Sequence, residues 1–196
     1  MSSDPLLKAA IAHWGPRFVA NGVVLTDFEE VTGSLSSYDD WCRAWSARAA
    51  HHEQLGREAL ARKHFLTAGE CLQRAGVYYH FASFLFVRDV AQMKAAHKKQ
   101  IECRQAALPH LRPPGERVEI PYQGKRLAGI LRKPAGVERP PVVAMAVGAS
   151  SNPKRHLLQS SYAPNRIEVA EEQERFATGQ LAPELRTHRG ARLRVS

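Results

Sequence analysis

The sequence lacks the features that mark membrane, secreted and metal-binding proteins. Its 196 residues contain no apolar run near the roughly 18–20 residues that a membrane span needs. Cys42, Cys71 and Cys103 form no C-x-x-C pair, which excludes a zinc ribbon and a dithiol redox motif. No H-x-x-x-H or H-E-x-x-H pair occurs, so we expect no metal and no cofactor. No basic region followed by an apolar core marks the N-terminus. We therefore expect a cytoplasmic protein with reduced thiols and no membrane partner.

The charge is basic on balance, with 28 Lys+Arg against 19 Asp+Glu and a net charge of +9. This excess is spread along the chain without a basic stripe interleaved with aromatic residues, and none of the usual nucleic-acid motifs is present. We therefore expect a solvated basic surface rather than a nucleic-acid partner. A nucleic-acid-binding protein remains an alternative that rests on charge alone.

Helical periodicity dominates the first 115 residues. The hydroxyl of Ser37 is expected to accept the amide of Asp40 and so to cap a helix. One face of this helix carries large and small residues at helical spacing: Trp41, Trp45, Ala49 and His52. Gly56 marks a break in this helix or a close contact with another helix.

Two further helices follow. The segment Thr67-Ala-Gly-Glu70 has the pattern of a capping box and predicts a helix start. The next residues, 71–87, are apolar nearly all round, which predicts a helix buried on all sides. Asp89 is the expected N-cap of an amphipathic helix over 90–108, which the prolines that follow stop.

The period changes to two after Gly115. Residues 117–122 and 127–132 read as two strands joined by a turn at 123–125, and Pro121 favours an edge position for the first strand. Residues 142–147 form a continuous apolar run, which is typical of an interior strand covered on both faces.

The order of these elements predicts an incomplete α/β fold, because a parallel sheet needs more strands and crossover helices than 48 further residues supply. We expect a helical cap domain over 1–112, the start of an α/β core over 113–148 and a divergent, poorly ordered tail over 149–196. Within the tail, residues 167–176 are compatible with a short helix.

A known family shares these patterns. The segment I-P-Y-x-G-x-x-L-x-G-x-L-R-x-P at 120–134 is the most specific, and the stretches DDWCRAWSARAAHHEQLGREAL and AGECLQRAGVYYHFASFLFVRD support it. Residues from about Trp41 to Gly148 resemble the N-terminal part of α/β-hydrolases of the 2,6-dihydroxypseudooxynicotine hydrolase type. The resemblance implies a helical cap followed by the first three strands of the hydrolase sheet.

The resemblance also implies site residues. Gly148 and Ala149 fall where the family draws an oxyanion-hole amide, although a simple strand-ending turn is the alternative. Tyr79, His80 and Phe84 are candidates for lining a substrate pocket from the cap, with core packing as the alternative. No G-x-S-x-G nucleophile elbow occurs in the sequence, so we expect no catalytic residue in this chain. The divergent tail suggests a truncated or frame-disrupted gene.

Two interpretations of function follow. In the first, the chain is a truncated α/β-hydrolase-like protein, inactive alone, whose full-length relatives hydrolyse an ester or a C–C bond next to a carbonyl in a small molecule. In the second, residues 51–87 form a tetratricopeptide-like interaction module without enzymatic activity, although such stacks need about three repeats. A homo-oligomer is compatible with either interpretation.

Overall fold

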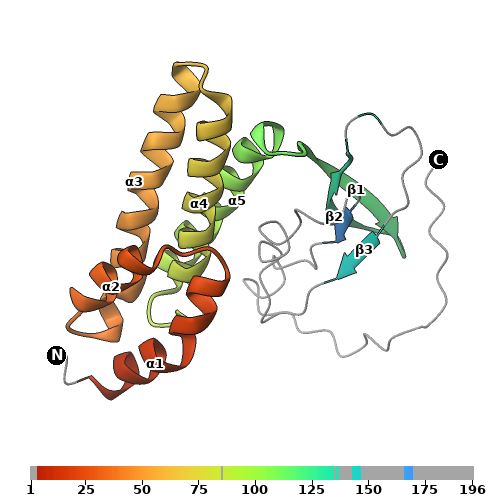
Figure 1. The fold of residues 1–196 in the computed structure, drawn as a ribbon. Coiled ribbons are helices and arrows are strands. Elements are labelled where there is room, and N and C mark those ends of the chain that lie inside the picture. The colour runs from red at the N-terminus through yellow and green to blue at the C-terminus, as the bar shows by residue number, and fades with distance from the viewer. Residues whose placement is uncertain (1–3, 85, 135, 137–142, 147–165, 170–196) are drawn as a thin grey trace.

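The computed structural model describes residues 4–84, 86–134, 136, 143–146 and 166–169. Its helical part precedes its strands, and the sheet lies to one side of the helices (Figure 1). The helices and short 3-10 turns are α1 (Pro5–Ala20), α2 (Leu25–Gly33), η1 (Tyr38–Asp40), α3 (Trp41–Ala61), α4 (Phe65–Ser83), α5 (Val90–Ala107) and η2 (Leu108–His110). The strands are β1 (Gly115–Tyr122), β2 (Lys125–Arg132), β3 (Val143–Ala146) and β4 (Arg166–Val169).

Helix α4 is the centre of the helical part. It packs between α3 and α5, and every residue from Ala75 to Ser83 is buried. The predicted burial on all sides is therefore confirmed, although the helix ends at Ser83 rather than at Val87. Its neighbour α5 begins after Asp89, whose side chain accepts the amides of Ala91 and Gln92, as the sequence predicts for an N-cap.

Aromatic side chains join α1 and α2 to this centre. The ring of Phe18 in α1 stacks on Phe81 of α4 with centroids 3.8 Å apart, and it meets the edges of Trp41 and Trp45 of α3. The predicted apolar face of α3 is confirmed, because its four residues are all buried. Trp41 Nε1 also donates to the carbonyl of Phe81 at 3.0 Å, which satisfies one of the free carbonyls at the end of α4.

Two predicted helix starts are wrong. The hydroxyl of Ser37 accepts the amide of Asp39 at 3.2 Å rather than that of Asp40, because residues 38–40 form a tighter 3-10 turn. Thr67 lies inside α4, whose N-cap residue is His64. Lys63, with a φ of 60°, ends α3 in the left-handed conformation, and α4 starts only two residues later.

The hairpin matches its prediction closely. β1 and β2 pair antiparallel with Tyr122 opposite Lys125, and Gln123 and Gly124 between them have φ values of 47° and 72°. Two central residues with positive φ fit a tight two-residue hairpin turn. In the described sheet β1 is an edge strand, as Pro121 indicates.

The rest of the sheet differs from its prediction. The described strand order is β1-β2-β4-β3, with β4 antiparallel to β2 and parallel to β3. β3 therefore stands at the end of the described sheet and not inside it, because β4 takes the place beside β2. Residues 166–169, part of which we expect to be helical, are this strand, and the register places Ile167 opposite Leu131.

Arg132 fastens the sheet to the helical part. This buried side chain donates from Nε and Nη2 to the carbonyl of Pro113, at 2.9 and 2.6 Å. Pro113 lies in the link between η2 and β1, so the end of β2 is held against the last residues of the helical part. None of the helices in the described part combines the length and the apolarity that crossing a bilayer requires.

The tight contact between α3 and α4 gives the first testable prediction. A Cβ at Gly56 would lie 2.7 Å from Leu72 Cγ and 3.1 Å from the Leu72 backbone nitrogen. We expect Gly56→Ala to lower the free energy of unfolding by about 1–3 kcal/mol, because the two helices must separate. Urea unfolding followed by circular dichroism measures this loss.

Gly33→Ala is the matched control. Gly33 is also helical, but a Cβ there meets nothing within 4 Å. We expect the free energy of unfolding to stay unchanged or to rise by up to about 1 kcal/mol, because alanine favours helix. Equal losses in the two variants would show that the α3–α4 contact does not depend on Gly56.

Candidate functional site

The predicted site residues fall into two groups. Gly148 and Ala149 lie outside the described residues, so their role in an oxyanion loop stays a prediction. Tyr79, His80 and Phe84 lie in the last turn of α4 and directly after it. The structure shows the contacts of these three residues, and they face different neighbours.

Tyr79 takes part in a buried ionic cluster. Its hydroxyl donates to Glu53 Oε2 at 3.0 Å, and Glu53 is only 6% exposed. The same carboxylate accepts Arg57 Nε at 2.9 Å and Lys99 Nζ at 3.1 Å. One carboxylate therefore joins α3, α4 and α5.

The electrostatics of this cluster favour a fixed ion pair. Burial acts to raise the pKa of Glu53, but the hydrogen bonds from Arg57, Lys99 and Tyr79 outweigh it, so this pKa lies below its ordinary value. Burial and the hydrogen bond to Glu53 raise the pKa of Tyr79. At neutral pH, Glu53 is therefore an anion and Tyr79 a neutral donor. This arrangement stabilises the bundle and offers no proton near neutral pH.

His80 and Phe84 belong to an aromatic cluster with α1. The two rings stack with centroids 5.4 Å apart, and Phe84 meets the ring of Trp14 edge-on at 5.2 Å. His80 is buried, whereas Phe84 and Trp14 are half-buried. The structure thus brings His80 and Phe84 together and turns Tyr79 toward the ionic cluster. The pocket-lining role of all three stays a prediction.

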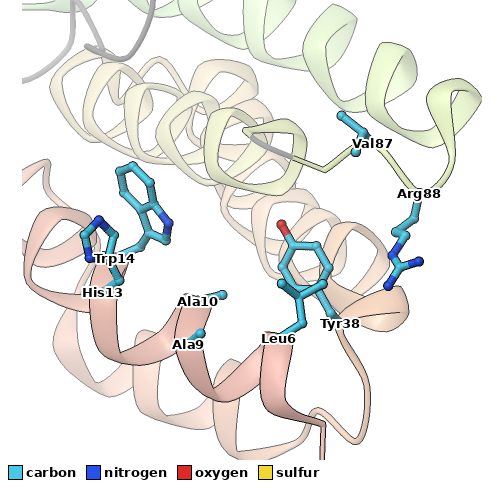
Figure 2. A pocket seen from close by; sticks show the side chains of 8 residues that line it. All are labelled: Leu6, Ala9, Ala10, His13, Trp14, Tyr38, Val87 and Arg88. Carbon is cyan, nitrogen blue, oxygen red and sulfur yellow. The ribbon is translucent and has the colours of Figure 1, made fainter.

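A shallow groove of about 430 Å³ borders this aromatic cluster. It lies between α1 and the segment that joins α4 to α5, and Trp14 belongs to both the groove and the cluster (Figure 2). Its lining is largely apolar: Leu6, Ala9, Ala10, His13, Trp14, Tyr38, Val87 and Arg88. Arg88 is the cationic group of this lining, and its Nε lies 3.4 Å from Asp39 Oδ1.

A second polar cluster joins α2, α3 and α4. Asp27 Oδ2 accepts the hydroxyl of Tyr78 at 2.5 Å and lies 2.9 Å from His52 Nε2. Arg48 Nη1 lies 3.2 Å from Asp27 Oδ1. The amide of Val24, just before α2, donates to the hydroxyl of Tyr78 at 3.1 Å.

This cluster has the parts of an oriented base. Burial acts to raise the pKa of Asp27, but hydrogen bonds from Tyr78 and His52 and the charge of Arg48 keep it below its ordinary value. An ionised Asp27 fixes the proton of His52 on Nε2, which leaves a lone pair on Nδ1. That nitrogen is buried and has no hydrogen-bond partner among the described residues. His52 is not among the residues that line the groove beside α1 or a second groove around Phe65 and His110.

Sequence analysis missed both carboxylates. A usable signal for the second cluster was present, because His52 lies on the apolar face of α3 and a buried imidazole needs a partner. Nothing local indicates that Asp27 supplies that partner from another helix. Within the described ranges, no group of three or more His, Cys, Asp or Glu side chains is placed to hold a metal ion.

Comparisons with known proteins identify relatives. No protein-family model matches the chain. The 2,6-dihydropseudooxynicotine hydrolase of Paenarthrobacter nicotinovorans is 32% identical over 141 residues, which are 71% of this chain and 37% of that enzyme. The alpha/beta hydrolases xenA of Xenoacremonium sinensis and pydG of Acremonium sp are each 27% identical over 139 residues, which are 67% of this chain and 33% of theirs.

A solved structure extends the likeness to the fold. The crystal structure of 2,6-dihydroxy-pseudo-oxynicotine hydrolase matches with a TM-score of 0.68 and 26% identity, over 79% of this chain and 44% of that chain. The chain thus spans less than half of the length of these relatives. The predicted fold class is confirmed, because the order of helices followed by strands matches the solved hydrolase over 44% of its chain.

The buried ionic cluster gives the second testable prediction. Tyr79→Phe removes one of the donors to the buried Glu53 carboxylate and keeps the aromatic ring. We expect the free energy of unfolding to fall by about 1–3 kcal/mol, because a buried acceptor loses a partner. Urea unfolding at neutral pH measures the loss.

Tyr122→Phe is the matched control, since Tyr122 is 46% exposed on β1. We expect a change within about 0.5 kcal/mol for this surface substitution. A loss in Tyr79→Phe no larger than in Tyr122→Phe would contradict a stabilising role for the Tyr79 hydroxyl.

Proposed function

Because this chain is an α/β-hydrolase-like protein related to 2,6-dihydropseudooxynicotine hydrolase, we propose that it supplies the helical cap and the first strands of a hydrolase. The substrate is a small molecule, and the bond cleaved is an ester or a C–C bond next to a carbonyl. The observation that carries this proposal is the match to the solved hydrolase, which extends over 79% of this chain.

The proposed chemistry needs an oxyanion hole and a nucleophile. We assign backbone donors of the hole to Gly148 and Ala149, which follow the last residues of the apolar third strand in the sequence. Amide hydrogens at that position stabilise the negative oxygen that develops when a serine, or a water activated by histidine, attacks the carbonyl. The nucleophile and its base come from residues beyond these 196, because the sequence contains no G-x-S-x-G elbow.

The 196 residues alone are accordingly proposed to be inactive. In this proposal, residues 1–112 act as the cap, residues 113–148 begin the core, and the cap turns its aromatic cluster toward the substrate. Among the three predicted pocket residues, Phe84 suits this role best, because it is half-buried and packs against Trp14, which lines the apolar groove. We also propose a cytoplasmic location, which agrees with free thiols at Cys42, Cys71 and Cys103.

The interaction-module alternative gains no support. The named relatives are hydrolases, and α3 with α4 forms a single helical hairpin whose next neighbour, α5, leads into the strands. We therefore propose no second function.

Assays of the purified chain give the third testable prediction. We expect no hydrolysis of p-nitrophenyl esters above the buffer rate and no covalent labelling by a fluorophosphonate, because no activated serine is present. A purified serine esterase serves as a positive control in both assays. Turnover by this chain that a serine-directed reagent abolishes would show that the chain carries its own nucleophile and would contradict its inactivity.

The proposal that a hydrolase core accompanies this chain has a separate test. Sequencing the encoding DNA across codon 148 and past codon 196, followed by translation in three frames, is expected to reveal a G-x-S-x-G elbow with later aspartate and histidine partners. If no frame encodes them, the chain is a product in its own right and the hydrolase proposal fails.

A further inference from the structure

The cluster around Asp27 has a feature that the proposed function does not use. Its carboxylate gathers Tyr78 from α4 and His52 and Arg48 from α3, so one side chain of α2 bonds to both neighbouring helices. We propose that Asp27, His52 and Tyr78 form a proton-operated latch, which holds α2 against the α3–α4 pair and loosens it when His52 takes up a second proton.

The closed latch requires a neutral imidazole. Nε2 of His52 donates to the ionised carboxylate of Asp27, and Nδ1 then carries a lone pair. A second proton would turn Nδ1 into a charged donor, buried and without an acceptor among the described residues. An unmet donor of this kind costs about 1–3 kcal/mol, and more when it is charged. Opening α2 toward water removes that cost.

The charges around His52 have opposing effects on its protonation. Asp27 on α2 favours the protonated ring, whereas Arg74 on α4 and His51 on α3 oppose it. Arg48 on α3 forms ion pairs with Asp27 and Glu30 of α2. Burial is the largest influence, and together with the opposing charges it outweighs Asp27, so the pKa of His52 lies below its ordinary value.

This direction fixes how stability depends on pH. The unfolded chain binds a proton at His52 below pH about 6.5, whereas the folded chain resists that proton until the pH is lower. The contribution of His52 to folding is therefore complete above pH about 6.5 and is lost as the pH falls from there toward the lower pKa of the folded state. The latch is therefore expected to loosen at mildly acidic pH.

The release is expected to concentrate in α2. This helix has nine residues, buries only Phe28 and Val31, and its N-cap residue Val24 has no capping side chain. The Tyr78 hydroxyl instead accepts the Val24 amide while donating to Asp27, so the start of α2 depends on the same cluster. α5 lies outside the cluster and provides an internal reference.

Hydrogen exchange read by mass spectrometry tests the latch on the full chain at about pH 7.5 and about pH 5.5. After correction for intrinsic exchange, we expect protection of α2 amides to fall by up to about tenfold at the lower pH. That pH lies about one unit below the ordinary histidine pKa of about 6.5, and each unit corresponds to a factor of ten. Protection of α5 is expected to change less. Equal protection of α2 at both values would overturn the proposal.

Two variants locate the effect. His52→Gln keeps an amide donor for Asp27 but cannot titrate, so we expect its α2 protection to be independent of pH in this window. His51→Gln removes the adjacent, exposed histidine, whose charge is the weakest of the influences on His52 named above, and is expected to keep the pH response of α2. A pH response that persists in His52→Gln, or that disappears in His51→Gln, would overturn the assignment to His52.

A measurement on the unmodified chain keeps the test valid if a variant fails to fold. Nitrogen-15 NMR of the histidine side chains distinguishes the tautomers and titrates each ring. We expect His52 to be neutral with its proton on Nε2 at neutral pH and to titrate below its ordinary range. A doubly protonated His52 at neutral pH would overturn the latch.

Discussion

The burial of α4 is the constraint on which the helical part depends. A helix that is apolar nearly all round cannot expose any face, so α1, α3 and α5 each have to cover part of it. Two glycines allow the close approach. Gly56 on α3 leaves room for the side chain of Leu72 on α4. Gly69 on α4 lies so near His110 that a Cβ there would be 2.8 Å from the His110 carbonyl oxygen. The bundle therefore closes over α4 at both places without room for larger side chains.

The same constraint explains the two polar clusters. Consecutive tyrosines on a buried helix point about 100° apart, so they meet different neighbours. Tyr78 reaches Asp27, and Tyr79 reaches Glu53. Each carboxylate then collects basic or imidazole donors besides the tyrosine, which is the condition under which a buried charge is tolerated. The lowered pKa values of both carboxyl groups agree with this account, because their hydrogen bonds outweigh the effect of burial.

Local signals predicted much of this architecture. The aromatic face of α3, the Asp89 cap and the turn at Gly124 depend on neighbouring residues, and the structure confirms each of them. The wrong predictions arose where distant or competing contacts decide. The start of α4 is set by the left-handed end of α3, which overrides the pattern at Thr67. Strand β4 pairs with residues more than twenty positions away, and no local period shows that choice.

In the candidate site too, local features could be predicted from the sequence and contacts between distant residues could not. Its aromatic members were visible as a cluster along α4, whereas their partner Trp14 and the carboxylates Asp27 and Glu53 come from other helices. Pairing across helices leaves no mark in the local sequence, so such residues are found only after packing is known.

The difference between the two parts of the chain bears on function. The helices share a core in which the polar groups of Asp27 and Glu53 are paired, so this part has its own source of stability. β1 differs, because most of its residues are exposed and none is fully buried. A sheet gains stability when its faces are covered, and the main contact of β1 with the described helical elements is with η2. The exposed residues of β1 and the lack of a G-x-S-x-G elbow in the sequence agree with the proposal that a larger α/β core accompanies these strands. A helical part with its own core beside a largely exposed strand is the arrangement expected if this chain provides one portion of a hydrolase.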